Sequence, residues 1–138
     1  FTVEEAKVHC GHLSGCHCKS LFLRDKKGNP WLVVARDDAR VDLKALAKTL
    51  GAGNLSFGTP ERLAEVLGVI PGAVTPFALI NDTDRRVRVV LDRAMMQAAL
   101  VNYHPLANDA TTAITPADLA RFLAATGHDP RTIDLDPI

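Results

Sequence analysis

The segment from His17 to Ala35 constrains the fold more than any other stretch of the chain. Its strand-like pattern runs through Arg24, breaks at the polar stretch Asp25–Pro30, and resumes in the β-rich run Trp31–Ala35. Two strand-forming runs around a short loop with glycine and proline are typical of a β-hairpin. We therefore expect an antiparallel pair that forms locally, against which the rest of the chain packs.

Helix signals and further strand-like runs alternate after this hairpin without a strict β-α-β rhythm. Capping residues and apolar spacing predict helices over the first ten residues and after Asp42, Thr59, Asp92 and Thr115. Strand-like runs cover Leu55–Phe57, Phe77–Asn81, Val87–Leu91 and Ala110–Ile114, and the second and third of these are expected to pair as a hairpin around Asp82–Asp84.

This mixture of elements predicts an α+β domain with a mixed, mainly antiparallel sheet flanked by helices. A chain of 138 residues fits one domain with one core, so we expect residues 1–138 to form a single domain. No apolar run approaches the length of about 20 residues that a bilayer crossing needs. No secretory signal pattern follows Phe1 and the cysteine count is odd, so we expect reduced thiols in a cytoplasmic protein.

The formal net charge is zero, which excludes a whole-molecule field that attracts nucleic acid. Any contact with nucleic acid must therefore be local. Three short basic groups are possible patches, although each is more typical of a solvated face: Lys26 with Lys27, Lys44 with Lys48, and Arg85, Arg86 and Arg88.

A cluster of thiols and imidazoles lies near the N-terminus, at Cys10, His12, Cys16, His17 and Cys18. It holds enough ligands for zinc, but its spacing is irregular and strand alternation would separate His17 from its two cysteine neighbours. We predict neither a metal nor another cofactor, and we interpret the cysteines as small packing residues. A regulator that depends on thiols or metal remains the alternative.

Lys19 stands at the entry to the apolar run Leu21–Leu23, where a strand should enter the core. An ammonium there either extends along the strand to solvent or binds an anion. The loop Gly68–Pro76 has two glycines and two prolines among apolar residues, which is typical of a helix-to-strand connection or of a loop with exposed amides for an oxyanion. His104 and Asn108 form a further polar pair, usually a packing feature and otherwise a base or ligand.

Four segments together resemble a known family: Gly15–Asp25, Gly72–Pro76, Tyr103–Thr112 and Asp118–His128. They are similar to the YbaK-type aminoacyl-tRNA editing domains, and among these to the free-standing ProX-like relatives of the insertion domain of prolyl-tRNA synthetase. The resemblance implies an α+β fold and hydrolysis of the ester in a mischarged tRNA, mainly alanyl-tRNA(Pro). It also implies the acceptor end of tRNA as a partner, with prolyl-tRNA synthetase as a second one.

By this resemblance, Lys19 corresponds to the family's essential lysine, the segment Gly72–Pro76 to its catalytic loop, and His104 to its His-Pro motif. Ser20 stands where relatives commonly have asparagine. The resemblance thus predicts Lys19, Gly72 and Pro76 as catalytic residues, and Ser20, Ala73, Val74, Thr75, His104 and Asn108 as substrate-binding residues.

A mechanism follows as a hypothesis. Lys19 would bind the phosphate of the terminal adenosine, because it repels the protonated α-amine of the substrate. The Gly72 amide and its neighbours would bind the ester carbonyl, and the free ribose hydroxyl would activate water. A small pocket would exclude the prolyl ring. The alternative is a non-catalytic module of the same fold that binds the acceptor end or a synthetase.

Overall fold

The computed structural model describes residues 16–36, 39, 41–70, 74–97, 101–103 and 112–133. Its strands are β1 (Cys16–Asp25), β2 (Pro30–Arg36), β3 (Leu55–Phe57), β4 (Arg88–Asp92), β5 (Val101–Tyr103), β6 (Thr112–Ile114) and β7 (Arg131–Ile133). Its α-helices are α2 (Leu43–Leu50), α3 (Pro60–Leu67) and α4 (Pro116–Ala125), and two 3-10 helices, η1 (Pro76–Asn81) and η2 (Met95–Gln97), lie between them. The predicted helix over the first ten residues lies outside the described residues.

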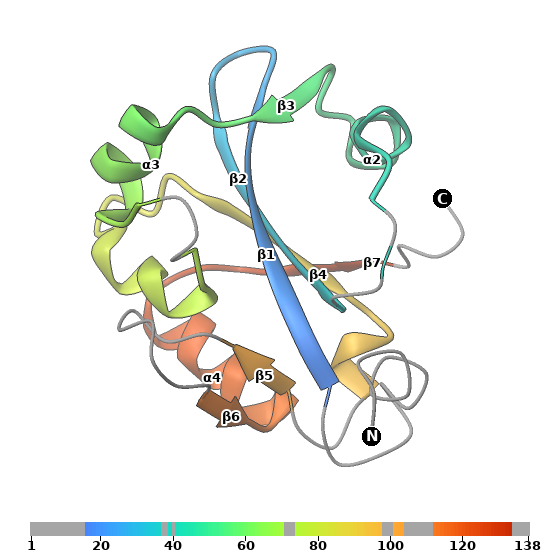
Figure 1. Ribbon diagram of the computed structural model, residues 1–138, viewed down its shortest axis with the longest axis vertical. Helices are drawn as coiled ribbons and strands as arrows, with labels where there is room; N and C mark the ends of the chain where they lie inside the picture. The colour runs from blue at the N-terminus through green and yellow to red at the C-terminus, as the bar shows by residue number, and fades with distance from the viewer. Residues whose placement is uncertain are drawn as a thin grey trace.

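The described strands form one seven-stranded sheet with helices on both faces (Figure 1). The strand order is β6-β5-β1-β2-β4-β7, and β3 pairs with β1 beside this path. Pairing is antiparallel for β1–β2, β1–β3 and β5–β6, and parallel for β1–β5, β2–β4 and β4–β7. The α+β class with a mixed sheet is confirmed, with the two kinds of pairing equally represented in this part of the chain.

The predicted hairpin is present as β1 and β2, with Lys19 opposite Ala35 and Leu23 opposite Trp31. The buried carboxylate of Asp25 holds its loop in place. One oxygen of this carboxylate accepts hydrogen bonds from the backbone N–H groups of Lys27 and Asn29, each at 2.9 Å. The other oxygen accepts a hydrogen bond from the Trp31 indole N–H at 3.1 Å. This bond connects the loop to the beginning of β2.

Three predicted helices are confirmed, and each begins at the expected cap. The side chains of Asp42, Thr59 and Thr115 accept hydrogen bonds from backbone N–H groups in the first turns of α2, α3 and α4. α2 ends at Gly51, where the backbone turns left-handed with a φ of 67°. Among the described residues, no helix is long and apolar enough to span a membrane.

The predicted strand Phe77–Asn81, and with it the second hairpin, is wrong. Thr75 accepts a hydrogen bond from the Phe77 backbone N–H, and Pro76 supplies a helical φ at the first position, so the segment forms η1 instead. The run that follows does form a strand, β4, but it pairs in parallel with β2. The apolar residues of η1 are too few to distinguish a strand from a short helix by periodicity.

The predicted helix after Asp92 is reduced to the single turn η2 in the described part of the chain. Asp92 lies before this turn, and its carboxylate accepts a hydrogen bond from the Ala94 backbone N–H at 3.1 Å. β6 forms within the predicted strand Ala110–Ile114, whereas β5 and β7 were not predicted. Both missed strands have only three residues, which is too short for alternation to show.

The sheet separates two apolar cores. The first lies on the side of α3, η1, η2 and α4, and the second lies on the side of α2, at the right of the sheet in Figure 1. Residues of β2 alternate between them, with Leu32 and Val34 in the first core and Trp31, Val33 and Ala35 in the second. This alternation fixes the face on which each side chain of the neighbouring strands lies.

Candidate functional site

Lys19 lies near the beginning of β1, directly opposite Ala35 on β2. Residues opposite each other on paired strands share a face, so Lys19 lies on the face of the second core, as Leu21 and Leu23 do. The side chain is half-buried, and its Nζ donates a hydrogen bond to the carbonyl oxygen of Ala39 at 2.6 Å. The segment that follows β2 therefore holds the ammonium at a defined position.

The Ala39 carbonyl orients the Lys19 ammonium without neutralising its charge. Among the described residues, Lys19 makes no ion pair with a carboxylate and has no other side-chain hydrogen bond. An ammonium carries three N–H donors, and one of them is used here. Two donors and the full positive charge are thus available to an anionic or carbonyl-bearing ligand.

Arg36 and Asp92 form a buried ion pair at the same end of the sheet. The Arg36 Nε and its backbone N–H donate to one Asp92 oxygen at 2.9 Å and 3.1 Å, and the other oxygen accepts from the Ala94 backbone N–H. The Asp92 side chain is only 1% exposed. Because this carboxylate is already bound by several donors, it does not compensate the charge of Lys19 and is not available as a general base.

The predicted catalytic loop is described only at its C-terminal end. Thr75 and Pro76 are buried, and the Thr75 hydroxyl and carbonyl both accept hydrogen bonds from the first turn of η1. Val74 packs against the first core, which is also the face of Ser20, since Ser20 lies opposite Val34. The described end of the loop and Ser20 thus share one face of the sheet, and Lys19 lies on the other.

Four predicted site residues lie outside the described residues: Gly72, Ala73, His104 and Asn108. Their roles, and the distance from Lys19 to the Gly72 amide, stay predictions. Of the thiol and imidazole cluster, only Cys18 has a described side chain, and it packs against the first core. No group of three His, Cys, Asp or Glu side chains within the described ranges is placed to hold a metal ion.

A comparison with known proteins decides the family. The family model for aminoacyl-tRNA editing domains matches residues 1–122 of the 138. The chain belongs to the aminoacyl-tRNA editing domain family. The resemblance seen in four short sequence segments is thereby confirmed.

Relatives of this editing domain include the prolyl-tRNA synthetase associated domain-containing protein 1 of Danio rerio. It is 46% identical over 138 residues, which cover 99% of this chain and 75% of the relative. The prolyl-tRNA editing protein ProX of Acetoanaerobium sticklandii is 40% identical over 118 residues, which cover 85% of this chain and 72% of the relative. A crystal structure of a candidate trans-editing enzyme for prolyl tRNA synthetase has a TM-score of 0.68 and 27% identity, covering 97% of this chain and 78% of that one.

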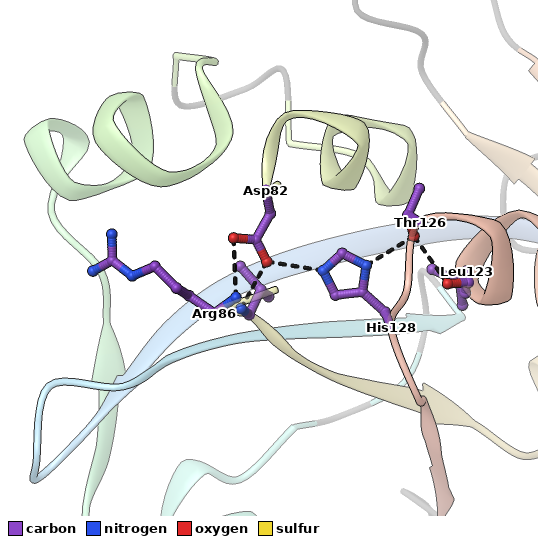
Figure 2. A network of polar contacts seen from close by, with 6 residues as sticks. Asp82, Arg86, Leu123, Thr126 and His128 are labelled. Carbon is purple, nitrogen blue, oxygen red and sulfur yellow. Dashed lines mark hydrogen bonds and ion pairs between the residues drawn. The ribbon is translucent and has the colours of Figure 1, made fainter. Parts of the chain in front are cut away.

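The editing domain also contains a buried polar network that the sequence analysis did not identify (Figure 2). The Asp82 carboxylate accepts from the backbone N–H groups of Arg86 and Val87 and pairs with Nε2 of His128 at 2.8 Å. The Nδ1 of His128 lies 2.8 Å from the Thr126 hydroxyl, which in turn donates to the carbonyl of Leu123. The side chains of Asp82 and His128 are 2% and 1% exposed.

An Asp-His-Thr series has the residue types of a nucleophilic triad, but this one functions as a structural clamp. The Thr126 hydroxyl donates to the Leu123 carbonyl and contacts Nδ1 of His128. Nε2 of His128 contacts the Asp82 carboxylate at 2.8 Å. The Thr126 hydroxyl is engaged by Leu123 and His128, and the network joins the end of α4 to the loop before β4.

The clamp also sets the acidity of Asp82. Burial, the largest single influence, raises the pKa of this carboxyl, but hydrogen bonds from His128 and from the backbone N–H groups of Val87 and Arg86 together outweigh it and lower the pKa below its ordinary value. The pKa of Asp25 is lowered in the same way, because burial is outweighed by the bonds from Trp31, Asn29 and Lys27. The sequence contains little signal for the clamp, since Asp82 and His128 are 46 residues apart.

Proposed function

We propose that this editing domain is a trans-editing deacylase that hydrolyses mischarged tRNA, with alanyl-tRNA(Pro) as its main substrate. Family membership supports editing, and one relative is named a prolyl-tRNA editing protein. The observation that carries the proposal is the half-buried ammonium of Lys19, which is held by the Ala39 carbonyl and balanced by no carboxylate of the described residues. Such a cation is suited to an anionic substrate.

In this proposal Lys19 binds the phosphate of the 3′-terminal adenosine. The α-amine of the substrate is protonated, so it would be repelled by a nearby ammonium in a site of low dielectric constant. A phosphate next to the ester is instead attracted by the positive charge of Lys19. It can accept hydrogen bonds from the two N–H groups that Ala39 leaves unused. Lys19 therefore positions the nucleotide rather than the amino acid.

The ester carbonyl is assigned to the Gly72–Pro76 loop. Backbone amides aimed at the developing oxyanion lower the barrier, and a single donor of this kind contributes about 10²–10³-fold in rate in known hydrolases. Thr75 and Pro76 would support this loop, because both are buried and fixed to η1.

The general base is assigned to the substrate itself. Asp92 is bound to Arg36, and the pair of Asp82 and His128 is sealed in the clamp, so neither carboxylate is placed to take a proton from water. The free ribose hydroxyl beside the ester is adjacent to the reacting carbonyl and can position or activate the water. His104 and Asn108 remain predicted ligands of the substrate.

Substrate choice would follow a size sieve. A pocket that accepts the alanyl methyl group excludes the larger prolyl ring by overlap, which protects correctly charged tRNA. Discrimination against a smaller side chain is weaker, about 1–3 kcal/mol per methylene, so the glycyl ester should be hydrolysed at a reduced rate. The seryl ester, whose side chain adds one hydroxyl to the methyl group, should also be hydrolysed at a reduced rate. Ser20 and Val74 are predicted to line this pocket.

The test is a panel of tRNA(Pro) molecules charged with alanine, serine, glycine or proline and incubated with catalytic amounts of the protein. We expect release of alanine with multiple turnovers and retention of proline. Equal rates on alanyl and prolyl esters would refute the sieve. Binding of the charged tRNA without release of any amino acid would instead identify a non-catalytic binding module of the same fold.

A second substrate series tests the proposed base. Alanyl-tRNA(Pro) that lacks the free hydroxyl of the terminal ribose should bind with unchanged affinity and react at least ten times more slowly. Unchanged hydrolysis would remove the ribose from the mechanism. The same proposal makes the acceptor end of tRNA the principal partner, prolyl-tRNA synthetase a second one, and the cytoplasm the place of action.

A further inference from the structure

A pocket of about 370 Å³ opens at the end of the sheet where β2, β4 and β7 begin. Three arginines from separate segments line it: Arg85 from the loop before β4, Arg88 from the first position of β4, and Arg131 from the first position of β7. Trp31 of β2 lies among them. We call the group of Trp31, Arg85, Arg88 and Arg131 the arginine pocket.

The positive charges of the arginine pocket are not balanced within it. None of the three guanidinium groups makes an ion pair with a carboxylate of the described residues. Asp129 is the one acidic residue in the lining, and His128 is already bound to Asp82. Like charges brought together without partners raise the local potential, which attracts an anion.

The guanidinium groups are held in place by neutral contacts. Arg88 lies over the ring of Trp31, with its Cζ 5.4 Å from the ring centroid, and Arg131 donates to the Thr49 carbonyl at 3.5 Å. Arg85 has a φ of 56°, an uncommon conformation for a residue with a long side chain. Its guanidinium lies so close to Gly127 that a Cβ there would overlap it. These contacts orient the donors without pairing their charge with a carboxylate of the described residues.

Three residues of the arginine pocket, Trp31, Arg88 and Arg131, lie on the same face of the sheet as Lys19. Trp31 lies beside Arg88 in the register of β2 and β4, and Lys19 lies opposite Ala35. Trp31 and Ala35 are four residues apart along β2, which is about 13 Å at the rise of a strand. This separation equals the axial rise of roughly four nucleotides in a stacked strand.

We propose that the arginine pocket binds a backbone phosphate of the tRNA acceptor arm, roughly four nucleotides before the nucleotide that carries the ester. The placement rests on the proposed function, in which Lys19 binds the terminal adenosine. Guanidinium groups suit this role, because their planar donors match phosphate oxygens and their charge persists at every physiological pH. With a net charge of zero, the chain needs such a local cation cluster to hold RNA.

A phosphate contact fixes position without reading sequence. The arginine pocket should therefore strengthen binding of charged and uncharged tRNA alike, and of tRNAs that differ in sequence. Its contribution should also weaken with salt, since each phosphate contact releases counterions on binding. These two properties distinguish the arginine pocket from the acyl-binding part of the site.

The first experiment measures binding of uncharged tRNA at salt concentrations from about 50 to 200 mM. Arg88→Ala and Arg131→Ala should each weaken binding several-fold at low salt and reduce the slope of log affinity against log salt by about 1. Arg121→Ala is the matched control, because Arg121 is exposed on α4 and paired with Asp118. Wild-type affinity and slope in the variant lacking Arg85, Arg88 and Arg131 would overturn the proposal.

The second experiment uses Trp31, the single tryptophan of the sequence, as a reporter. Its fluorescence should change when tRNA binds, and the change should disappear in Arg88→Ala. Inorganic phosphate should compete only weakly, since one small anion lacks the other contacts of tRNA. If phosphate saturates the fluorescence change while tRNA affinity is unaffected by the arginine substitutions, the arginine pocket is a small-anion site and the proposal fails.

The two proposals fail separately. Arginine-dependent binding of tRNA without release of amino acid would contradict the deacylase assignment and support the arginine pocket. Multiple-turnover deacylation with the same kcat/KM in the wild type and the triple variant would contradict the arginine pocket and leave the deacylase assignment standing.

Discussion

The two ends of the sheet hold their cations in different ways. At one end, which we call the lysine end, Lys19 is half-buried, its ammonium is fixed by a backbone carbonyl, and the neighbouring Arg36 is neutralised by Asp92. At the other end, three exposed guanidinium groups surround the arginine pocket without an acidic partner in the described part of the chain. One end presents a single placed donor, and the other presents a cluster of solvated charge.

This difference assigns different tasks to the two ends. A half-buried cation interacts strongly with a ligand that displaces water, whereas exposed cations are screened by salt and act mainly on affinity and encounter. The lysine end is suited to positioning the reacting nucleotide, and the arginine pocket is suited to retaining the rest of the tRNA. Each prediction below tests whether the two ends are separable in this way.

The largest effect is expected on stability, at the clamp that supports the arginine pocket. Asp82→Ala leaves the buried His128 ring without its partner and removes the acceptor of the Arg86 and Val87 backbone N–H groups. Breaking a buried pair in this way lowers the free energy of unfolding by about 3–5 kcal/mol, measured by denaturant titration. Asp118→Ala, which removes an exposed pair, should cost less than about 1 kcal/mol. Similar losses in the two variants would contradict the structural role of the clamp.

The next effect is expected on turnover, at the lysine end. Lys19→Ala should lower the single-turnover rate of alanyl-tRNA(Pro) deacylation by about 10²–10³-fold, the range found when one placed donor is removed from a hydrolase. Affinity for uncharged tRNA should change far less, because the arginine pocket remains intact. Arg88→Ala should show the opposite pattern, with raised KM and nearly unchanged kcat. If Lys19→Ala and Arg88→Ala changed KM and kcat to the same extent, the two ends of the sheet would not have separate tasks.

Acid should lower the free energy of unfolding through two aspartates near the end of the sheet that carries the arginine pocket. The pKa values of Asp25 and Asp82 are lowered in the folded state, so the unfolded chain takes up protons first as the pH falls. Their contribution to stability is fully present above the ordinary aspartate pKa and is lost as the pH falls through the lowered, folded-state pKa. Urea titrations of the wild type at decreasing pH should show this loss of stability. The Asp82→Asn variant should lose less stability over the same pH range. The same pH dependence in both proteins would exclude Asp82 as a source.

The smallest effect is expected from Gly127→Ala. Gly127 has a φ of 82°, and a Cβ there would displace the Arg85 guanidinium. Gly51→Ala is the matched control, because Gly51 has a similar φ of 67° but open space around a Cβ. Both variants should lose about 1 kcal/mol of stability from backbone strain, whereas only Gly127→Ala should weaken tRNA binding, by about threefold. Equal tRNA affinities would remove Arg85 from the arginine pocket.

Local patterns predicted much of the framework. The hairpin of β1 and β2 and the caps at Asp42, Thr59 and Thr115 depend on neighbouring residues, so the sequence contains what is needed to infer them. The prediction for Phe77–Asn81 was wrong because a run of four apolar residues fits either a strand or a helical turn. The capping hydroxyl of Thr75 and the following residue, Pro76, favour the helical turn η1 over a strand.

The site was predictable only in part. Lys19 stood out because a cation at the entry to an apolar strand needs a reason, and the structure supplies its hydrogen bond to Ala39. Arg85 and Arg88 were noticed as a basic group, but Arg131 and Trp31 were not connected to them, because they come from strands far away in the sequence. The clamp of Asp82, His128 and Thr126 was missed for the same reason.

By itself, the sequence determined which segments form the first hairpin and the three capped helices, and it placed the chain in its family. Capping, turn geometry and alternation act over a few residues, so they can be read along the chain. The tertiary structure alone decided that Lys19 has no carboxylate partner among the described residues and that three distant arginines converge on one pocket. These properties depend on parallel strand pairing and burial, which bring together residues that no local rule connects.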